Sequence, residues 1–215
     1  MTGRSPRPGE AARSYGGRSL ADRRADRRAR FHEAGVELFG TVGFARVTIS
    51  ALCTEAGLSR RQFYEEFSGS EDLMTEIYDV IQQMTRERVT EAVRAADRSD
   101  LSVVAHAAIA AYIDAVATDP RLVRCLFVEV GGISETMEKH RVAGRDDWAG
   151  YIADVVASLP NSPCRTIDYR ATAFIGSLIA VVHRWATSEQ RPDRSEIIDL
   201  LSDMLLRLAA DEETT

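Results

Sequence analysis

Four side chains with long hydrogen-bonding groups lie together in the short stretch Ser59–Phe67: Arg60, Arg61, Gln62 and Tyr64. A guanidinium group can donate two hydrogen bonds to guanine, and a carboxamide can pair in the same way with adenine. Hydroxyl groups hydrogen-bond phosphates, which positions a protein on DNA without reading its sequence. The stretch therefore has the groups needed to contact DNA, although arginine and glutamine also occur on ordinary solvated helix faces.

The other reactive residue types show no spacing that is typical of catalysis or metal binding. None of the four histidines lies in an HExxH or Cys-His pattern, and the sequence has no GxSxG, phosphate-binding glycine loop or GxGxxG motif. The neighbours Asp146 and Asp147 would point in different directions on a helix. We therefore expect no catalytic residue, no metal and no cofactor, and an enzyme is the less favoured alternative of a different class.

Two short helices are predicted to position the donors. Thr48 is a suitable N-cap for a helix that Gly57 ends, and Ser59 is a suitable N-cap for the next helix. A short turn that contains glycine is typical of a helix-turn-helix. Packing through Leu52 and Phe63 would hold the second helix outward, and such a helix fits the major groove of DNA. Helix pairs of this kind also occur in bundles that do not bind DNA.

The rest of the chain is predicted to be helical as well. Apolar residues recur at helical spacing, and there is no alternating strand pattern and no repeat of fixed period. About nine helices are expected, so the predicted class is all-α, with a three-helix head at the N-terminus and a helical bundle after it. The predicted helices cover residues 19–39, 49–56, 59–67, 70–97, 101–118, 119–131, 134–158, 163–187 and 195–210.

Residues 27–74 resemble the DNA-binding head of the TetR (tetracycline-repressor-like) family of bacterial transcriptional regulators. The resemblance rests on the segments AGVELFGTVGFARVTI, AGLS and FYEEFSGSEDL. It covers a minor part of the chain closely, and the remainder is similar only in the number and order of its helices.

The resemblance implies a homodimer that binds a pseudo-palindromic DNA operator. Each subunit would place residues 59–64 in successive major grooves, about 34–36 Å apart. A small hydrophobic effector would enter the body, shift the fourth helix and release the DNA, so repression is the expected mode of action. The last two helices, about 163–187 and 195–210, stand where family members pair. A helical protein-binding adaptor that has lost DNA binding is the main alternative.

Two residues depart from the family pattern. Glu66 stands where histidine, tyrosine or asparagine is common, and Ser70 stands where lysine is common. The usual residues serve the phosphate backbone, so Glu66 would repel it, and nearby arginines are expected to compensate. The residues expected to contact DNA are Arg46, Thr48, Ser59, Arg60, Arg61, Gln62 and Tyr64.

The large side chains of the body fit two interpretations. Aromatic residues at helical spacing commonly fill a core, whereas the resemblance implies that they line a largely apolar effector pocket. The excess of acidic residues in the body favours a neutral or cationic ligand, or else serves solubility. The residues expected to line the pocket are Met84, His106, Tyr112, Phe127, Trp148, Tyr151 and Phe174, with His106 as the polar anchor.

Charge is distributed unevenly along the chain. Residues 1–30 carry nine arginines and three acidic residues, a charge of +6, whereas the remainder carries −12. A basic segment next to an acidic body suggests an end that binds polyanions, or simply a solvated tail. We expect a disordered basic arm (1–18), a helix-turn-helix DNA-binding domain (19–69) and a helical ligand-binding and dimerisation domain (70–212). The sequence shows no signal-peptide h-region and three scattered cysteines, so we expect a cytoplasmic protein with reduced thiols.

Overall fold

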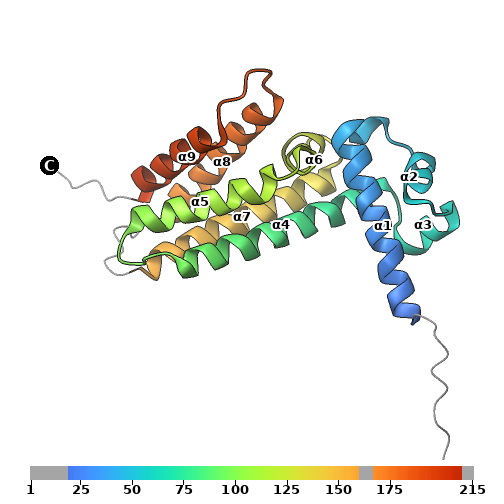
Figure 1. The fold of residues 1–215 in the computed structure, drawn as a ribbon, viewed down its shortest axis with the longest axis horizontal. Helices are drawn as coiled ribbons and strands as arrows, with labels where there is room; N and C mark the ends of the chain where they lie inside the picture. The colour runs from blue at the N-terminus through green and yellow to red at the C-terminus, as the bar shows by residue number, and fades with distance from the viewer. Residues whose placement is uncertain (1–18, 160–166, 210–215) are drawn as a thin grey trace, which may run out of the picture.

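The computed structural model describes residues 19–159 and 167–209 of the 215-residue chain. Within these ranges it contains nine α-helices, a 3₁₀-helix, a π-helical turn and no strand, which confirms the all-α prediction. Figure 1 shows α1, α2 and α3 as a small head at one end of a longer helical body. The elements are α1 (Leu20–Thr41), η1 (Phe44–Arg46), α2 (Ile49–Ala56), α3 (Arg60–Glu66), α4 (Ser70–Ala95), α5 (Leu101–Ala117), α6 (Pro120–Arg124), η2 (Cys125–Glu129), α7 (Glu135–Ala157), α8 (Ile167–Thr187) and α9 (Arg194–Ala209).

Some expectations fall outside the described residues. The basic arm, residues 1–18, is one of them, and so is the predicted start of the eighth helix at residue 163. Helix α4 begins at Ser70, as predicted, with Gly69 as its N-cap, and it ends at Ala95. Another predicted helix differs from the structure. The predicted helix 119–131 is the short helix α6 followed by the π-helical turn η2.

Three phenylalanines form the centre of the head. Phe31 of α1 meets Phe63 and Phe67 edge-on, with ring centroids 5.2 and 5.9 Å apart. All three side chains are almost completely buried. Edge-to-face packing adds to the gain from burial because the positive ring edge meets the negative ring face. This cluster fixes the angle between α1 and α3.

The turn between α2 and α3 is set by local hydrogen bonds. Gly57 ends α2 in the left-handed conformation, with φ of 61°, which glycine adopts without steric cost. Ser59 caps α3, and its hydroxyl accepts a hydrogen bond from the backbone N–H of Gln62. Both helix ends therefore lie where the sequence predicts them.

Helix α4 is shared by the head and the body. Its 26 residues span about 39 Å in one continuous helix. Near its start, Leu73 and Ile77 pack next to Gly35 of α1. Further along, Tyr78 and Gln82 line a cavity of the body. The two parts of the molecule thus share one rigid element.

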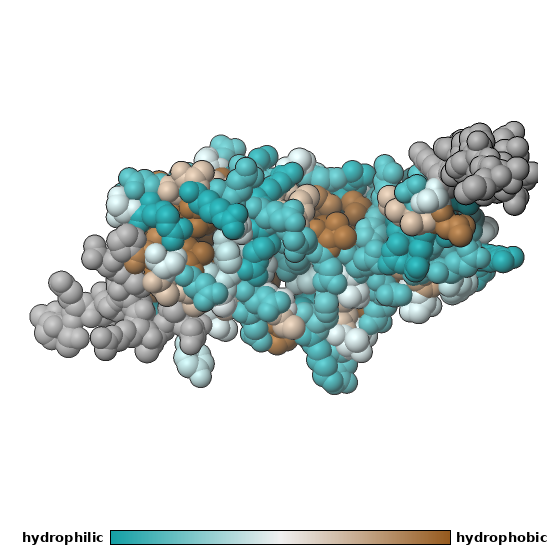
Figure 2. Space-filling model, turned by 90° about the horizontal axis from the view of Figure 1, so that it is seen from below, coloured by the Kyte–Doolittle hydropathy of each residue, from teal (hydrophilic) through white to brown (hydrophobic). Residues whose placement is uncertain are grey.

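The body is a bundle in which α5 packs against α4 and α9, and α8 packs against α7 and α9. Its outer surface is mostly hydrophilic, with separate hydrophobic patches (Figure 2). No single helix of the described chain is long and apolar enough to span a membrane, although Leu101–Ala117 and Pro120–Glu129 pass that test together as a pair bent by 101°.

Helix α6 meets the end of α1 at very close range. A Cβ atom added to Gly40 would lie 2.5 Å from Cβ and 2.8 Å from Cα of Arg121. The Arg121 guanidinium also pairs with Glu37 of α1 and with Asp119. Only glycine at position 40 permits this approach, so the packing of the head on the body depends on it.

Replacing Gly40 with alanine is expected to destabilise the protein by about 1–3 kcal/mol, because the backbone of Arg121 must move. The matched control is Gly150→Ala in α7, where an added Cβ meets nothing within 4 Å. That change should stabilise the protein by up to about 1 kcal/mol through helix propensity. Urea unfolding measures both, and equal effects of the two substitutions would contradict the close packing of α1 and α6.

Candidate nucleic-acid interface

The outer face of α3 presents three of the predicted side chains to solvent. Arg60 and Arg61 are exposed, and Tyr64 is 53% exposed. Arg61 makes only a surface ion pair with Glu65 one turn later, at 3.0 Å. Exposed pairs of this kind contribute little, so the Arg61 guanidinium can exchange its partner for a base at small cost.

The other predicted residues form helix caps or flank them. The Thr48 hydroxyl accepts a hydrogen bond from the N–H of Ala51 and begins α2. The Gln62 carboxamide oxygen accepts hydrogen bonds from the N–H and the hydroxyl of Ser59, both at 2.9 Å. A two-bond contact from Gln62 to adenine would therefore require this capping box to open. Arg46 is exposed at the end of η1.

Glu66 does not face the outer side of α3. Its side chain is 1% exposed and points toward α1, where it is surrounded by arginines. Arg24 Nε donates to one carboxylate oxygen at 2.9 Å, and Arg27 donates to the other at 2.7 Å through a terminal guanidinium nitrogen. Arg28 donates to the Glu66 backbone carbonyl at 3.1 Å. The expectation that Glu66 repels a phosphate is therefore wrong, because the helix rotation directs it inward.

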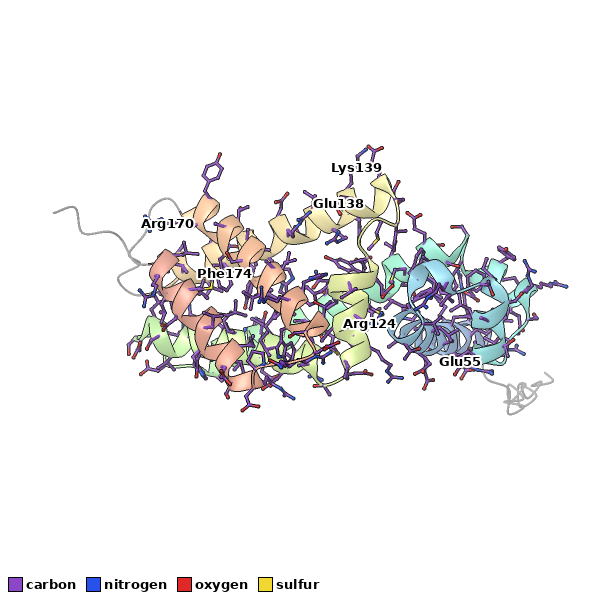
Figure 3. All side chains as sticks on the ribbon, turned by 90° about the horizontal axis from the view of Figure 1, so that it is seen from above. Glu55, Arg124, Glu138, Lys139, Arg170 and Phe174 are labelled. Carbon is purple, nitrogen blue, oxygen red and sulfur yellow. The ribbon has the colours of Figure 1, made fainter. Side chains whose placement is uncertain are left out.

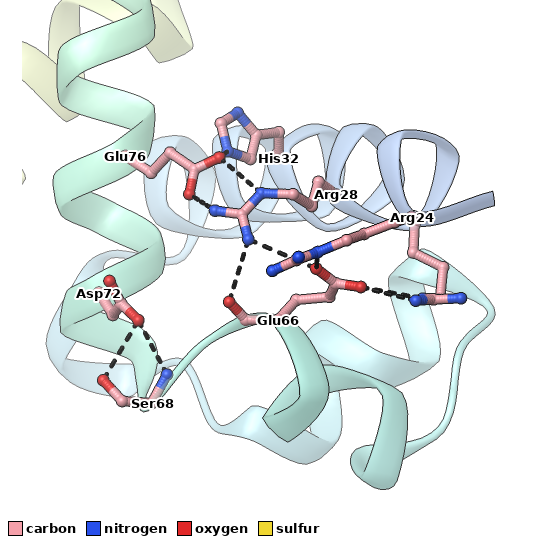
Figure 4. Close-up of polar contacts among 8 residues, drawn as sticks. Arg24, Arg28, His32, Glu66, Ser68, Asp72 and Glu76 are labelled. Carbon is pink, nitrogen blue, oxygen red and sulfur yellow. Dashed lines mark hydrogen bonds and ion pairs between the residues drawn. The ribbon is translucent and has the colours of Figure 1, made fainter. Parts of the chain in front are cut away.

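The same cluster reaches α4. Arg28 also pairs with Glu76, and His32 Nε2 lies 2.8 Å from the same carboxylate (Figure 4). At the start of α4, the backbone N–H of Ser68 donates to Asp72 at 2.8 Å. Charged side chains thus connect α1, α3 and α4. Of the arginines expected to compensate for Glu66 at the phosphate backbone, Arg24, Arg27 and Arg28 are instead engaged within the head.

Sequence reasoning missed the structural role of Glu66. The available signal was a spacing: Arg24, Arg27 and Arg28 occupy one face of α1 at helical intervals, as an internal anion would require. The other signal was an acidic residue at a position where the resemblance makes histidine, tyrosine or asparagine the common choice.

Two further expected features need correction. His106 lies on the exposed face of α5, with its Nε2 atom 3.7 Å from Asp199 of α9, and does not point into the body. The helix predicted over 163–187 was expected to pair through its apolar residues, but Ile175, Leu178 and Val182 are buried within the subunit's own core. Gly176, by contrast, is exposed on the opposite side of α8. In both cases the helix was predicted correctly and its rotation was not.

The remaining predicted pocket residues are brought together. Tyr112, Phe127 and Trp148 line one cavity between α4, α5, η2, α7 and α8. Tyr151 and Phe174 line the next cavity along the bundle, and Tyr112 and Trp148 line both cavities. Figure 3 labels Phe174 on α8. Met84 packs against the core, and the cavity residues of α4 are instead Tyr78 and Gln82.

The Glu66 cluster predicts a pH-dependent stability. Burial alone would raise the pKa of Glu66, but hydrogen bonds and charge from Arg24, Arg27 and Arg28 outweigh burial and lower it. A lowered pKa stabilises the fold at neutral pH, and this contribution disappears as the pH falls through the folded-state pKa, which lies below the ordinary value of a glutamate.

Glu66→Gln should destabilise the protein by about 1.5–3 kcal/mol at neutral pH, because charge-assisted hydrogen bonds are lost. The penalty should shrink at acidic pH, where the wild-type carboxyl is protonated too. Urea unfolding at both pH values measures this. The control Glu65→Gln changes an exposed carboxylate and should cost less than about 1 kcal/mol; equal losses for the two variants would refute the buried cluster.

Comparisons with known proteins agree with this geometry. Residues 32–77 match the family model described as bacterial regulatory proteins, tetR family. No curated protein matches the chain. Among solved structures, the fatty acid degradation regulator FadR from Bacillus halodurans is similar with a TM-score of 0.73 and 13% identity, over 84% of this chain and 94% of that one.

Two other solved structures have the same fold. FadR from Bacillus subtilis, solved in complex with stearoyl-CoA, gives a TM-score of 0.67 at 16% identity, over 84% of this chain and 97% of that one. A bacterial regulatory protein in the tetR family from Rhodococcus RHA1 gives 0.59 at 21% identity, over 87% and 98%. Residues 32–77 thus match the tetR-family model of bacterial regulatory proteins, and the described chain has the all-α fold of these solved structures.

Proposed function

We propose that this protein is a ligand-responsive, sequence-specific DNA-binding transcriptional regulator that represses from a pseudo-palindromic operator until a small hydrophobic molecule releases it. The observation that carries the proposal is the exposed face of α3. Arg60, Arg61 and Tyr64 are solvent-accessible there, while Phe63 and Glu66 anchor the opposite face in the head. A helix held in this way can enter a major groove with its donors free.

Operator binding requires two heads, and we assign dimerisation to α8 and α9. The outer side of α8 carries Ala173, Gly176 and Ala180, which are small and exposed, so another helix can approach closely. Leu200 of α9 is an exposed apolar residue, at 47%. In the dimer, the two α3 helices would lie about 34–36 Å apart, or one turn of DNA.

Two contacts can carry an effector signal from the body to the head. The first is α4, which is common to both. The second is η2: the Glu129 carboxylate accepts a hydrogen bond from the backbone N–H of Phe44 at 2.9 Å and pairs with Arg124 at 2.6 Å. Figure 3 shows Arg124 at the junction with the head. Since Leu126 and Phe127 of the same turn line a body cavity, a molecule that widens the cavity would displace Glu129 as well.

The adaptor alternative loses its main support. It rested on Glu66 and Ser70 as residues unsuited to phosphate contact. Glu66 is enclosed by arginines and Ser70 begins α4, so neither blocks the exposed face of α3.

Arg61→Ala is expected to lower the preference for operator over random DNA by about 1–3 kcal/mol, because a two-bond base contact is lost. Thr48→Ala should weaken binding to both DNAs equally through a phosphate contact, and should lose about 1 kcal/mol of stability with its cap. Selection from a random DNA pool followed by fluorescence anisotropy measures both effects. Equal losses on both DNAs for Arg61→Ala would show that Arg61 does not read bases.

Glu129→Ala should speed hydrogen exchange at the Phe44 amide, since that N–H loses its acceptor, and should reduce the effect of an effector on operator affinity. Hydrogen-exchange mass spectrometry of the peptide around residues 42–48 provides the measurement. The matched control is Glu87→Ala, an exposed carboxylate that bonds only Gln83 on the same helix. Unchanged exchange at Phe44 would rule out η2 as a connection.

A further inference from the structure

Three cavities follow one another along the body. The first contains Tyr112, Trp148, Ile175 and Leu178 in its wall, and the second shares all four of these residues. The second and third share Ala108, Tyr151, Ile152 and Leu205. The three cavities therefore form a row through the bundle, from the end near the head toward the far end, and neighbouring cavities are separated by the side chains that they share; this row is called the track below.

The two ends of the track differ in chemistry. The end near the head includes Arg141 and Arg145 of α7, together with Tyr78 and Gln82 of α4. The second cavity is lined by hydrocarbon and aromatic groups, and the third cavity is lined in the same way as far as Ala209. A ligand that fills the whole track must therefore be polar at one end and apolar along the rest.

The charged side chains in the wall of the first cavity are two arginines. Arg141 and Arg145 share the carboxylate of Glu138, at 2.6 and 2.8 Å. Glu138 lies on the solvent side, where its side chain is 48% exposed, whereas Arg141 is only 17% exposed. Glu138 and the nearby Asp79 do not line the cavity, so a ligand there meets the two guanidinium groups, which favour carboxylate or phosphate partners.

Hydrogen-bonding groups surround this charge. Gln82 donates to the Tyr78 hydroxyl at 2.9 Å, and Trp148 donates to the Gln82 carboxamide oxygen at 3.4 Å. Burial raises the pKa of Tyr78, and the hydrogen bond from Gln82 and the nearby charges of Arg141 and Arg145 oppose that rise. The Tyr78 O–H therefore stays protonated and can donate to an anion.

The track is long and narrow. Along α4 it extends from Gln82 to Val93, which corresponds to about 17 Å at the helical rise. The individual cavities measure only 30, 40 and 40 Å³, whereas ligand pockets usually enclose about 300–1,000 Å³. A slender chain suits this shape, and its entry must push α4, α7 and α8 apart.

We infer that the effector is a single-chain anionic amphiphile, whose head group binds Arg141 and Arg145 and whose alkyl chain lies along the track toward Ala209. This inference rests on the proposed function and specifies the ligand of the same body. It replaces the neutral or cationic ligand that overall composition favours. The acidic excess of the chain lies mostly on the surface, whereas the two arginines lie at the cavity.

The test is isothermal titration calorimetry of the full chain with four probes that share one saturated chain: tetradecanoate, its methyl ester, tetradecyltrimethylammonium and tetradecanoyl-CoA, each below its micelle concentration. The anionic probes should bind at least tenfold more tightly than the ester, and the cation should bind most weakly. Both anionic probes support the inference, and the comparison between them identifies the head group. Tighter binding of tetradecanoate indicates a carboxylate, and tighter binding of tetradecanoyl-CoA indicates a phosphate-bearing head group.

Substitutions locate the two ends. Arg141→Gln with Arg145→Gln should remove the preference for the anion over the ester, while Arg88→Gln, an exposed arginine on α4, should leave it unchanged. Ala108→Phe places a large side chain between the second and third cavities. The variant should therefore bind tetradecanoate at least tenfold more weakly, whereas its affinity for the shorter octanoate should be unchanged. Thermal unfolding of each variant verifies that it is folded.

Equal affinity for the acid and its ester, or a preference for the cation, would overturn the inference. Operator binding by the protein without any probe is measured in parallel by anisotropy. If the operator binds and no anion is preferred, the ligand class is wrong and the proposed regulator stands; if no DNA is bound, the proposed function itself fails.

Discussion

A buried carboxylate fixes the geometry on which DNA contact depends. Glu66 lies at the end of α3, and the arginines that surround it are on α1, as far as 42 residues away in the chain. Without the carboxylate, Arg24, Arg27 and Arg28 would repel one another on one face of α1. Without the arginines, Glu66 would be a buried, unpaired charge, which is far more costly than a paired one. Each side therefore requires the other, and together with the phenylalanine cluster they hold the recognition helix at one angle.

Rigidity in the head gives the body control over it. Because α1 and α3 move as one unit, a displacement of α4 or of η2 changes the orientation of the whole head rather than of one helix. The cavities of the body measure only 30 and 40 Å³ in this structure. A ligand larger than these cavities must separate helices to bind, and packed interiors respond by shifting whole elements rather than by deforming continuously. In the proposed dimer, such a shift of α4 would change the distance between the two heads, because α4 packs against both the head and the body.

For the proposed effector, local charge matters more than the overall charge of the chain. The chain is acidic outside its first 30 residues, and composition alone favours a cation. Most of those carboxylates are solvated on the surface, where water and salt screen them. Arg141 and Arg145 instead lie where the bundle closes, next to Tyr78 and Trp148. Charges at a partly buried site are screened less, so two guanidinium groups outweigh a larger number of remote acids.

The sequence by itself determined the helices and their ends, since these depend on hydrogen bonds within a few residues. Thr48, Gly57 and Ser59 set the helix-turn-helix in this way, and Asp119-Pro120 and Ser134 begin later helices as their side chains require. The family resemblance implied that Tyr112, Trp148 and Phe174, which lie on three different helices, line one pocket, and the structure brings them together at one cavity. What only the tertiary structure decided is the rotation of each helix about its axis. That rotation turns Glu66 inward and His106 outward, and buries Ile175 in its own subunit. It depends on the packing of several helices at once, and no short stretch of sequence contains that information.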